Sequence, residues 1–96
     1  MLKVLTVGTA ATDALKSTII VEGEMEGNKR YFKTADEAAN LPAVAFGTAI
    51  TPGDWTELTS NGLEITPNAA HTVVRVVEVN ASNEPIAVGD AVLNIG

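Results

Sequence analysis

The sequence contains no cysteine among its 96 residues, which excludes disulfide bonds and metal sites built on thiolates. Aromatic side chains make up only 4% of the chain, although hydrophobic residues together make up 46%. The core must therefore be built mainly from valine, isoleucine, leucine and alanine. No apolar run approaches the ~20 residues that a membrane helix needs, and the first residues lack the apolar stretch and cleavage site of a signal peptide. We therefore expect a protein made in the cytoplasm and left unprocessed.

Basic residues are also scarce, with six lysines and arginines against 12 acidic residues and a formal charge of −6. Nucleic-acid affinity depends mostly on clustered lysine and arginine side chains that contact phosphates. The one cluster, Lys29-Arg30 with Lys33, directly follows a row of glutamates between residues 22 and 26. The composition therefore argues against binding to nucleic acid or to an anionic membrane surface. The negative charge favours solubility.

Histidine occurs once, at His71. A Ser–His–Asp triad needs its three groups in contact, and nothing local in the sequence places Ser17, Ser60 or Ser82 beside His71. A zinc site would need further nitrogen or sulfur ligands. The glutamates at 22, 24 and 26 fall in a row on one strand face, which is typical of a solvated face and not of a cation site. We therefore expect a protein that is not an enzyme and that has no metal and no cofactor. The enzymatic alternative is a small hydrolase or isomerase, and it requires His71 and a carboxylate in one pocket.

Short segments rich in β-branched residues recur along the chain between turn residues. They predict strands at residues 3–7, 17–26, 29–33, 43–51, 55–58, 63–66, 72–80 and 86–95, with a loop at residues 8–12. The segment 72–80 has valine on both faces, which predicts a central place in the sheet. A chain of this length forms one domain, here residues 1–96. We expect a mainly β fold, a small antiparallel sandwich or partly open barrel of about seven strands.

Two turn signals predict β-hairpins because glycine and asparagine tolerate the positive φ angles of tight turns. Gly27-Asn28 would join the strand ending at residue 26 to the strand beginning at Lys29. That pairing would set Lys29 or Arg30 opposite the row of glutamates. Ser60-Asn61-Gly62 would join the strands on either side of it in the same way.

One short helix is predicted near residues 35–40. Thr34 followed by Glu37 has the spacing of a capping box, in which each side chain bonds to the other residue's backbone amide. Pro42 ends the helix because the residue before a proline avoids the helical region. Farther along, Pro52-Gly53-Asp54 predicts a turn, and Gly89-Asp90 predicts a bulge or bend in the last strand.

Four residues are candidates for contact with a partner: Leu2, Val4, Tyr31 and Trp55. Leu2 and Val4 belong to a terminal strand that can pair with an exposed sheet edge on a neighbour. Tyr31 and Phe32 point to opposite faces of their strand, so only one of them is expected to face the core. Tryptophan is a favoured anchor at interfaces and sugar sites, although core or subunit packing is the more common role in a small β domain.

The second half of the chain carries a valine-rich strand and then a late Ala-x-Gly-Asp-x-Val-Leu segment at residues 87–93. Over about the last third of the chain, this pattern resembles small bacteriophage head-decoration, or capsid cement, proteins. The resemblance implies a structural virion protein on the capsid exterior, made in the cytoplasm of a bacterial host. It implies the major capsid protein as partner and a homo-oligomer, with a trimer favoured. It carries over no functional residue, and a tail or other virion subunit fits the sequence equally well.

The alternative function is a carbohydrate- or cell-surface-binding β-sandwich module of the adhesin type. This alternative predicts that Trp55 or Tyr31 is exposed beside polar side chains.

Overall fold

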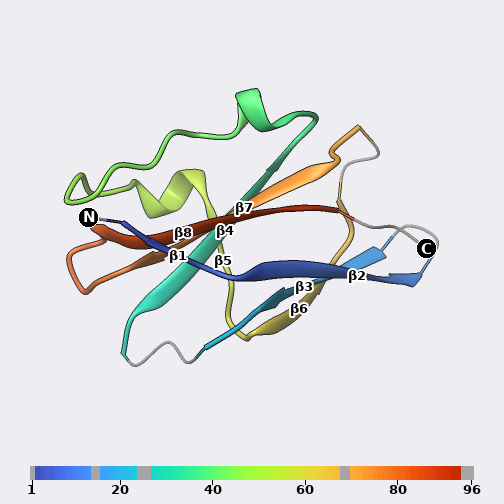
Figure 1. The fold of residues 1–96 in the computed structure, drawn as a ribbon, viewed down its shortest axis with the longest axis horizontal. Helices are drawn as coiled ribbons and strands as arrows, with labels where there is room; N and C mark the ends of the chain where they lie inside the picture. The colour runs from blue at the N-terminus through green and yellow to red at the C-terminus, as the bar shows by residue number, and fades with distance from the viewer. Residues whose placement is uncertain (1, 14–15, 24–26, 68–69, 94–96) are drawn as a thin grey trace.

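The computed structural model describes residues 2–13, 16–23, 27–67 and 70–93, and within them it shows two sheets packed face to face (Figure 1). The larger sheet has the strand order β1-β8-β7-β4-β5 and contains Lys3–Val4, Pro85–Val92, Val73–Val79, Lys29–Ala35 and Thr56–Glu57. The smaller sheet has the order β2-β3-β6 and contains Val7–Asp13, Lys16–Val21 and Gly62–Ile65. All pairings are antiparallel except the one between β1 and β8.

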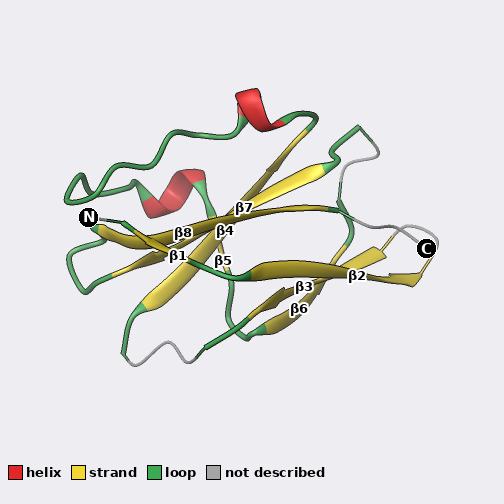
Figure 2. Cartoon of the chain, in the orientation of Figure 1, coloured by secondary structure: helices red, strands yellow, loops and turns green. Residues whose placement is uncertain are grey.

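The expected fold class is confirmed as a mainly β sandwich, and its sheets are not closed into a barrel. The order β2-β3-β6 over β8-β7-β4-β5 is that of an immunoglobulin-like sandwich, in which the chain crosses between the sheets after β1, β3, β5 and β6. The helical elements of the described residues are the 3-10 helices η1 (Ala38–Asn40) and η2 (Pro52–Asp54), drawn red in Figure 2. None of the helices in the described ranges is long and apolar enough to cross a membrane.

The valine-rich strand β7 lies at the centre of the larger sheet, as predicted, and separates two hydrophobic clusters. Val74 and Val76 face the smaller sheet and pack with Phe32 in the main core. Val77 and Val79 face the opposite way and form a second cluster. Burial of each valine side chain contributes roughly 1.5–3 kcal/mol. Both faces of this sheet therefore need a cover.

The cover of the outer face is the segment from Leu41 to Trp55, the 41–55 segment, which lies over the larger sheet in Figure 1. Its side chains Val44, Ile50 and Trp55 pack against the second cluster. The prediction of a strand at 43–51 was wrong, because this stretch contains no strand and buries apolar side chains without joining a sheet. The opposite error occurred at residues 8–12, which belong to β2 and not to a loop.

Both predicted hairpins were wrong, because each turn carries the chain from one sheet to the other. β3 pairs with β2 and β6 in the smaller sheet, whereas β4 pairs with β5 and β7 in the larger one. Asn61 likewise lies between β5 and β6, which belong to different sheets. The glutamates at 24 and 26 lie outside the described residues. Glu22 is exposed, as expected.

The predicted capping box is also absent at residues 34–37. The helical turn there begins only at Ala38, and its N-cap residue Glu37 makes no capping side-chain hydrogen bond. Asp36 holds this turn instead, because its Oδ1 accepts from the Glu37 amide at 3.0 Å and from Asn40 Nδ2 at 2.7 Å. The hydroxyl of Thr34 bonds to His71.

A buried ion pair closes one end of the space between the sheets. Arg30 on β4 is 2% exposed, and its Nε donates to Glu78 Oε1 on β7 at 2.8 Å. Its Nη1 donates to Asn61 Oδ1 at 2.6 Å and to the Gly23 carbonyl at 3.0 Å. The Glu22 carbonyl accepts from Nη2 at 3.4 Å. Arg30 therefore binds the larger sheet to the two connections that lead into and out of the smaller one.

At the other side of the sandwich, the chain crosses from β1 to β2 directly over Gly89. A Cβ built on Gly89 would lie 2.2 Å from the Leu5 carbonyl oxygen and 2.8 Å from Val7 Cγ2. Glycine is required at this position for close backbone approach. The predicted bulge is not at Gly89-Asp90, because the register between β7 and β8 shifts at Glu78/Val79.

Gly89→Ala is expected to destabilise the fold by about 1–3 kcal/mol, because the Leu5 backbone must move to admit the methyl group. Gly62→Ala is the matched control, because a Cβ at Gly62 meets nothing within 4 Å. Urea denaturation of both variants measures the effect. Equal stability of the two variants would contradict the close approach.

Arg30→Met is expected to cost about 3–5 kcal/mol in unfolding free energy, because it leaves the Glu78 carboxylate buried without its cation. The double variant Arg30→Met/Glu78→Leu should recover much of that loss. Lys16→Met serves as control, because Lys16 and Glu64 form an exposed pair at 3.8 Å. The exposed pair should contribute under ~1 kcal/mol. An Arg30→Met loss no larger than the control's would show that the buried pair is not needed.

Candidate functional site

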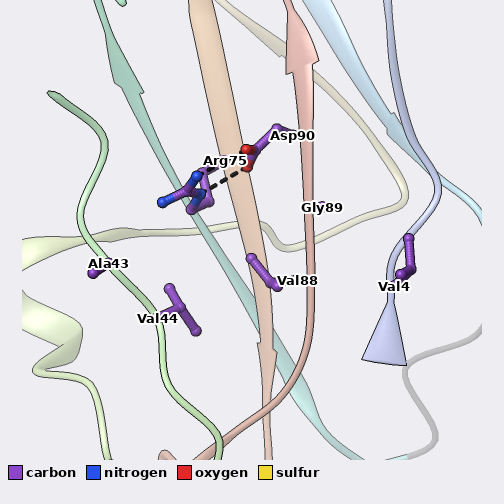
Figure 3. Close-up of a pocket in the computed structure, with 7 residues that line it drawn as sticks. All are labelled: Val4, Ala43, Val44, Arg75, Val88, Gly89 and Asp90. Carbon is purple, nitrogen blue, oxygen red and sulfur yellow. Dashed lines mark hydrogen bonds and ion pairs between the residues drawn. The ribbon is translucent and has the colours of Figure 1, made fainter. Parts of the chain in front are cut away.

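Among the described residues, several depressions lie along the 41–55 segment, and two of them include charged side chains. The first is a groove between this segment and the β1 edge (Figure 3). The second, here called the Trp55 notch, lies where the short strand β5 begins. The 41–55 segment contributes residues to the lining of both.

The groove has a volume of about 470 Å³ and mostly apolar walls. Its lining includes Val4, Ala43, Val44 and Val88, with Arg75 and Asp90 at one end. Val4 is 89% exposed, and its pairing partner in the sheet is Val88. The groove therefore offers a small apolar surface beside a two-residue edge strand.

Arg75 fixes the 41–55 segment above this groove. Its Nε and Nη2 donate to the two carboxylate oxygens of Asp90 at 2.7 and 2.8 Å, which is a bidentate pair. Its Nη1 donates to the Pro42 carbonyl at 2.8 Å. The hydrogen bond to Asp90 raises the pKa of Arg75 above its ordinary value, so the guanidinium stays charged at every ordinary pH. An arginine between buried valines in the sequence was the available signal for this role.

The Trp55 notch has a volume of about 300 Å³, at the small end of the range of ligand sites. The side chains around it come from β4, from the η2–β5 segment and from His71, two residues ahead of β7. They include Lys33, Thr34, Asp54, Trp55, Thr56 and His71. The notch thus brings the only tryptophan and the only histidine of the sequence into one depression.

The sequence Pro52-Gly53-Asp54 builds one wall of the notch. Proline at the first helical position suits a short turn because its ring fixes φ, and η2 follows with Asp54 N bonded to the Thr51 carbonyl at 2.9 Å. The Trp55 amide bonds to the Pro52 carbonyl at 3.1 Å. These bonds fix the backbone of Asp54 and Trp55 before β5 begins at Thr56.

The opposite wall is held by His71 and its neighbours. His71 Nδ1 and the Thr34 hydroxyl are 2.6 Å apart and share a hydrogen bond. Thr72 ties the same segment to the end of β4, because its amide donates to the Ala35 carbonyl at 2.9 Å and its hydroxyl to the Asp36 carbonyl at 2.7 Å. The hydrogen bond from Asn40 lowers the pKa of Asp36, and the nearby His71 lowers it further.

The four predicted contact residues do not lie together. Leu2 is half-buried ahead of β1, whereas Val4 is exposed at the groove. Tyr31 is 6% exposed, so the expectation that only one of Tyr31 and Phe32 faces a core was wrong. Each packs into its own cluster, because the 41–55 segment makes a second core on the outer face. Trp55 is half-buried between that cluster and the notch.

Within the described residues, the side-chain hydrogen bond of His71 is with Thr34 and not with a serine or a carboxylate. Ser17 is fully buried with its hydroxyl unpartnered, and Ser60 Oγ donates to the Gly62 carbonyl at 3.2 Å. Within the described ranges, no group of three or more histidine, aspartate or glutamate side chains is placed to hold a metal ion.

Comparisons with known proteins find the same domain fold in two solved structures. No protein-family model matches the chain, and no curated protein matches it. Two solved structures are similar, the S-layer protein SbsC domains 4–9 and the same protein's domains 7, 8 and 9. Each matches 93% of this chain with a TM-score of 0.66 and 24% sequence identity. The chain spans only 14% and 26% of those longer chains, so the likeness shows a shared domain fold.

The resemblance to bacteriophage head-decoration proteins was wrong, because the structural neighbours are S-layer protein domains. The valine-rich strand and the Gly-Asp segment that suggested it are β7 and β8, the centre of a common type of sandwich. These motifs report the packing of that sheet and do not distinguish one assembly from another.

Arg75→Met is expected to release the 41–55 segment from the sheet, because it removes the bond to the Pro42 carbonyl. The global loss should be ~1 kcal/mol or less, because Asp90 is well exposed. Hydrogen exchange should rise at residues 43–51 and remain unchanged in β7. Lys33→Met is the control, because Lys33 pairs with Arg75 in the sheet register and is exposed. Equal exchange in both variants would refute the anchoring role.

Proposed function

We propose that this chain is a structural module of the cell surface, one sandwich in a row of similar domains. The observation that carries the proposal is the shared fold with domains of an S-layer protein over 93% of the chain. In both of those structures the matched region is a small part of a longer, multidomain chain. The coarser alternative drawn from the sequence, a cell-surface β-sandwich module, is thus better supported than a capsid protein.

The path of the chain supports a module joined to others in line. Because β1 is parallel to β8 and pairs with Ala87 and Val88 near its start, the chain enters the sandwich where β8 begins. It leaves where β8 ends, toward the opposite end of the long axis (Figure 1). The principal dimensions are 37, 26 and 22 Å. Neighbouring domains would then follow one another along the longest dimension.

The surface and the core also suit a passive role. The acidic net charge keeps densely placed copies soluble. The core is bounded on one side by a satisfied ion pair and on the other by a backbone crossing that only glycine permits. In the notch, His71 Nδ1 and the Thr34 hydroxyl are held by each other, and we propose binding and assembly, and not catalysis, as the work of this domain.

The test is to find the native protein on intact cells of the organism that makes it. An antibody raised against the folded chain should label unpermeabilised cells, and external protease should remove the label. A cytoplasmic enzyme of the same cells is the control for leakage. Labelling that appears only after lysis would overturn the cell-surface role.

The in-line arrangement of domains can be tested separately by small-angle scattering. When the chain is placed between two folded reporter domains, small-angle scattering should show them separated along the 37 Å dimension. A control fusion that carries the second reporter at Ser82, in the turn before β8, should bring both reporters to one end. Identical scattering profiles would refute the proposed chain path and leave the localisation result standing.

A further inference from the structure

We propose that the Trp55 notch is a binding site for a neutral saccharide. The proposal goes beyond the structural role above, because a structural module of the cell surface need not bind any ligand. It rests on the side chains that meet in the notch and on the backbone groups exposed there.

Trp55 supplies an aromatic surface of the kind on which sugar rings pack. Part of its indole packs against the cluster of Tyr31, Val77 and Val79, and another part lines the notch. Within the described residues its indole N–H has no hydrogen-bond partner, so the donor is available to a ligand. An anchored aromatic group with a free polar atom suits a ligand that has both apolar faces and hydroxyl edges.

The polar groups around Trp55 are mixed in character. Asp54 offers carboxylate oxygens as acceptors, and Lys33 offers an ammonium donor. The Thr34 hydroxyl occupies Nδ1 of His71, which leaves the Nε2 of the imidazole for another partner. The charges of this one carboxylate and one ammonium group balance, so the notch has no net charge that would favour a phosphate or a charged peptide. Hydroxyl groups can bond to all of these side chains.

The backbone of β4 adds an unpaired donor and acceptor. The Leu58 amide bonds to the Arg30 carbonyl, so the backbone groups of Arg30 point toward β5 and those of Thr34, four residues on, point the same way. The pairing of β4 with β5 ends at Phe32 and Thr56. No described strand therefore pairs with the Thr34 N–H and C=O, which open onto the notch.

The size of this opening favours a sugar over an extended peptide. β4 ends at Ala35, so only its last residues lack a neighbour on this edge. Strand addition requires a longer row of alternating backbone groups. A depression of about 300 Å³ admits a small ligand such as one or two sugar rings.

The experiment is a titration of the intact chain with glucose, galactose, mannose, N-acetylglucosamine and their linear trisaccharides. Trp55 is the only tryptophan, so the fluorescence signal comes from this one indole, and amide shifts then show whether the ligand lies in the notch. At least one sugar should produce a saturable change, and the amide resonances of Thr34, Trp55 and His71 should shift. Asp54→Asn should weaken that binding about tenfold, the effect of losing a hydrogen bond to a charged group. Trp55→Phe should weaken it less than Trp55→Ala.

Glu57→Gln is the matched control, because it removes a nearby exposed carboxylate that does not line the notch. Its affinity should equal that of the unchanged chain. Three results would overturn the proposal: no saturable change with any of these sugars, shifts confined to residues outside the notch, or equal affinity of Asp54→Asn and Glu57→Gln. A six-residue extended peptide that shifts Thr34 where no sugar does would assign the notch to strand pairing instead.

Discussion

The buried contact between Arg30 and Glu78 is the interaction on which the arrangement of the two sheets depends. A cation and an anion removed from water are tolerated only when both are fully hydrogen-bonded. Arg30 meets this condition by donating hydrogen bonds to Glu78 on β7 and to both connections between the sheets. Asn28 Nδ2 donates to the second carboxylate oxygen of Glu78 at 3.0 Å. A different pairing of the sheets would leave these charges without partners, so the ion pair selects one sandwich among several that valine packing alone would permit.

The rest of the molecule follows from having a sheet with two apolar faces. One face is covered by the smaller sheet and the other by the irregular 41–55 segment, which Arg75 fixes through Pro42. An irregular cover is narrower than a sheet and leaves depressions at its borders. The groove near Val4 and the Trp55 notch are two of these depressions. The surface features of the domain are therefore a result of how its second core is closed.

The sequence predicted what depends on local pattern. The mainly β class, the central place of β7, the turn at residues 52–54 and the exposed side of Glu22 all follow from alternation and turn chemistry. It failed where the outcome depends on distant partners. Of the predicted turn residues, Gly27 has a positive φ but Asn61 and Gly62 do not, and turn residues do not specify which sheet receives the next strand. Valine on both faces of β7 already implied two cores, and this would have placed both Tyr31 and Phe32 inside. The contact of Thr34 with His71 spans 37 residues, so no local pattern could reveal it.

The parallel contact between β1 and β8 has a mechanical consequence. The Leu5 amide bonds to the Val88 carbonyl at 2.9 Å, and the Thr9 hydroxyl donates to the Val92 carbonyl farther along the same strand. Tension applied through the two ends of the chain would pull these strands past each other, so the bonds would share the force and break together. Strands joined at a hairpin would instead unzip one bond at a time. The same contact that closes the sandwich edge thus gives it its greatest resistance along the direction in which a linked row of domains would be stretched.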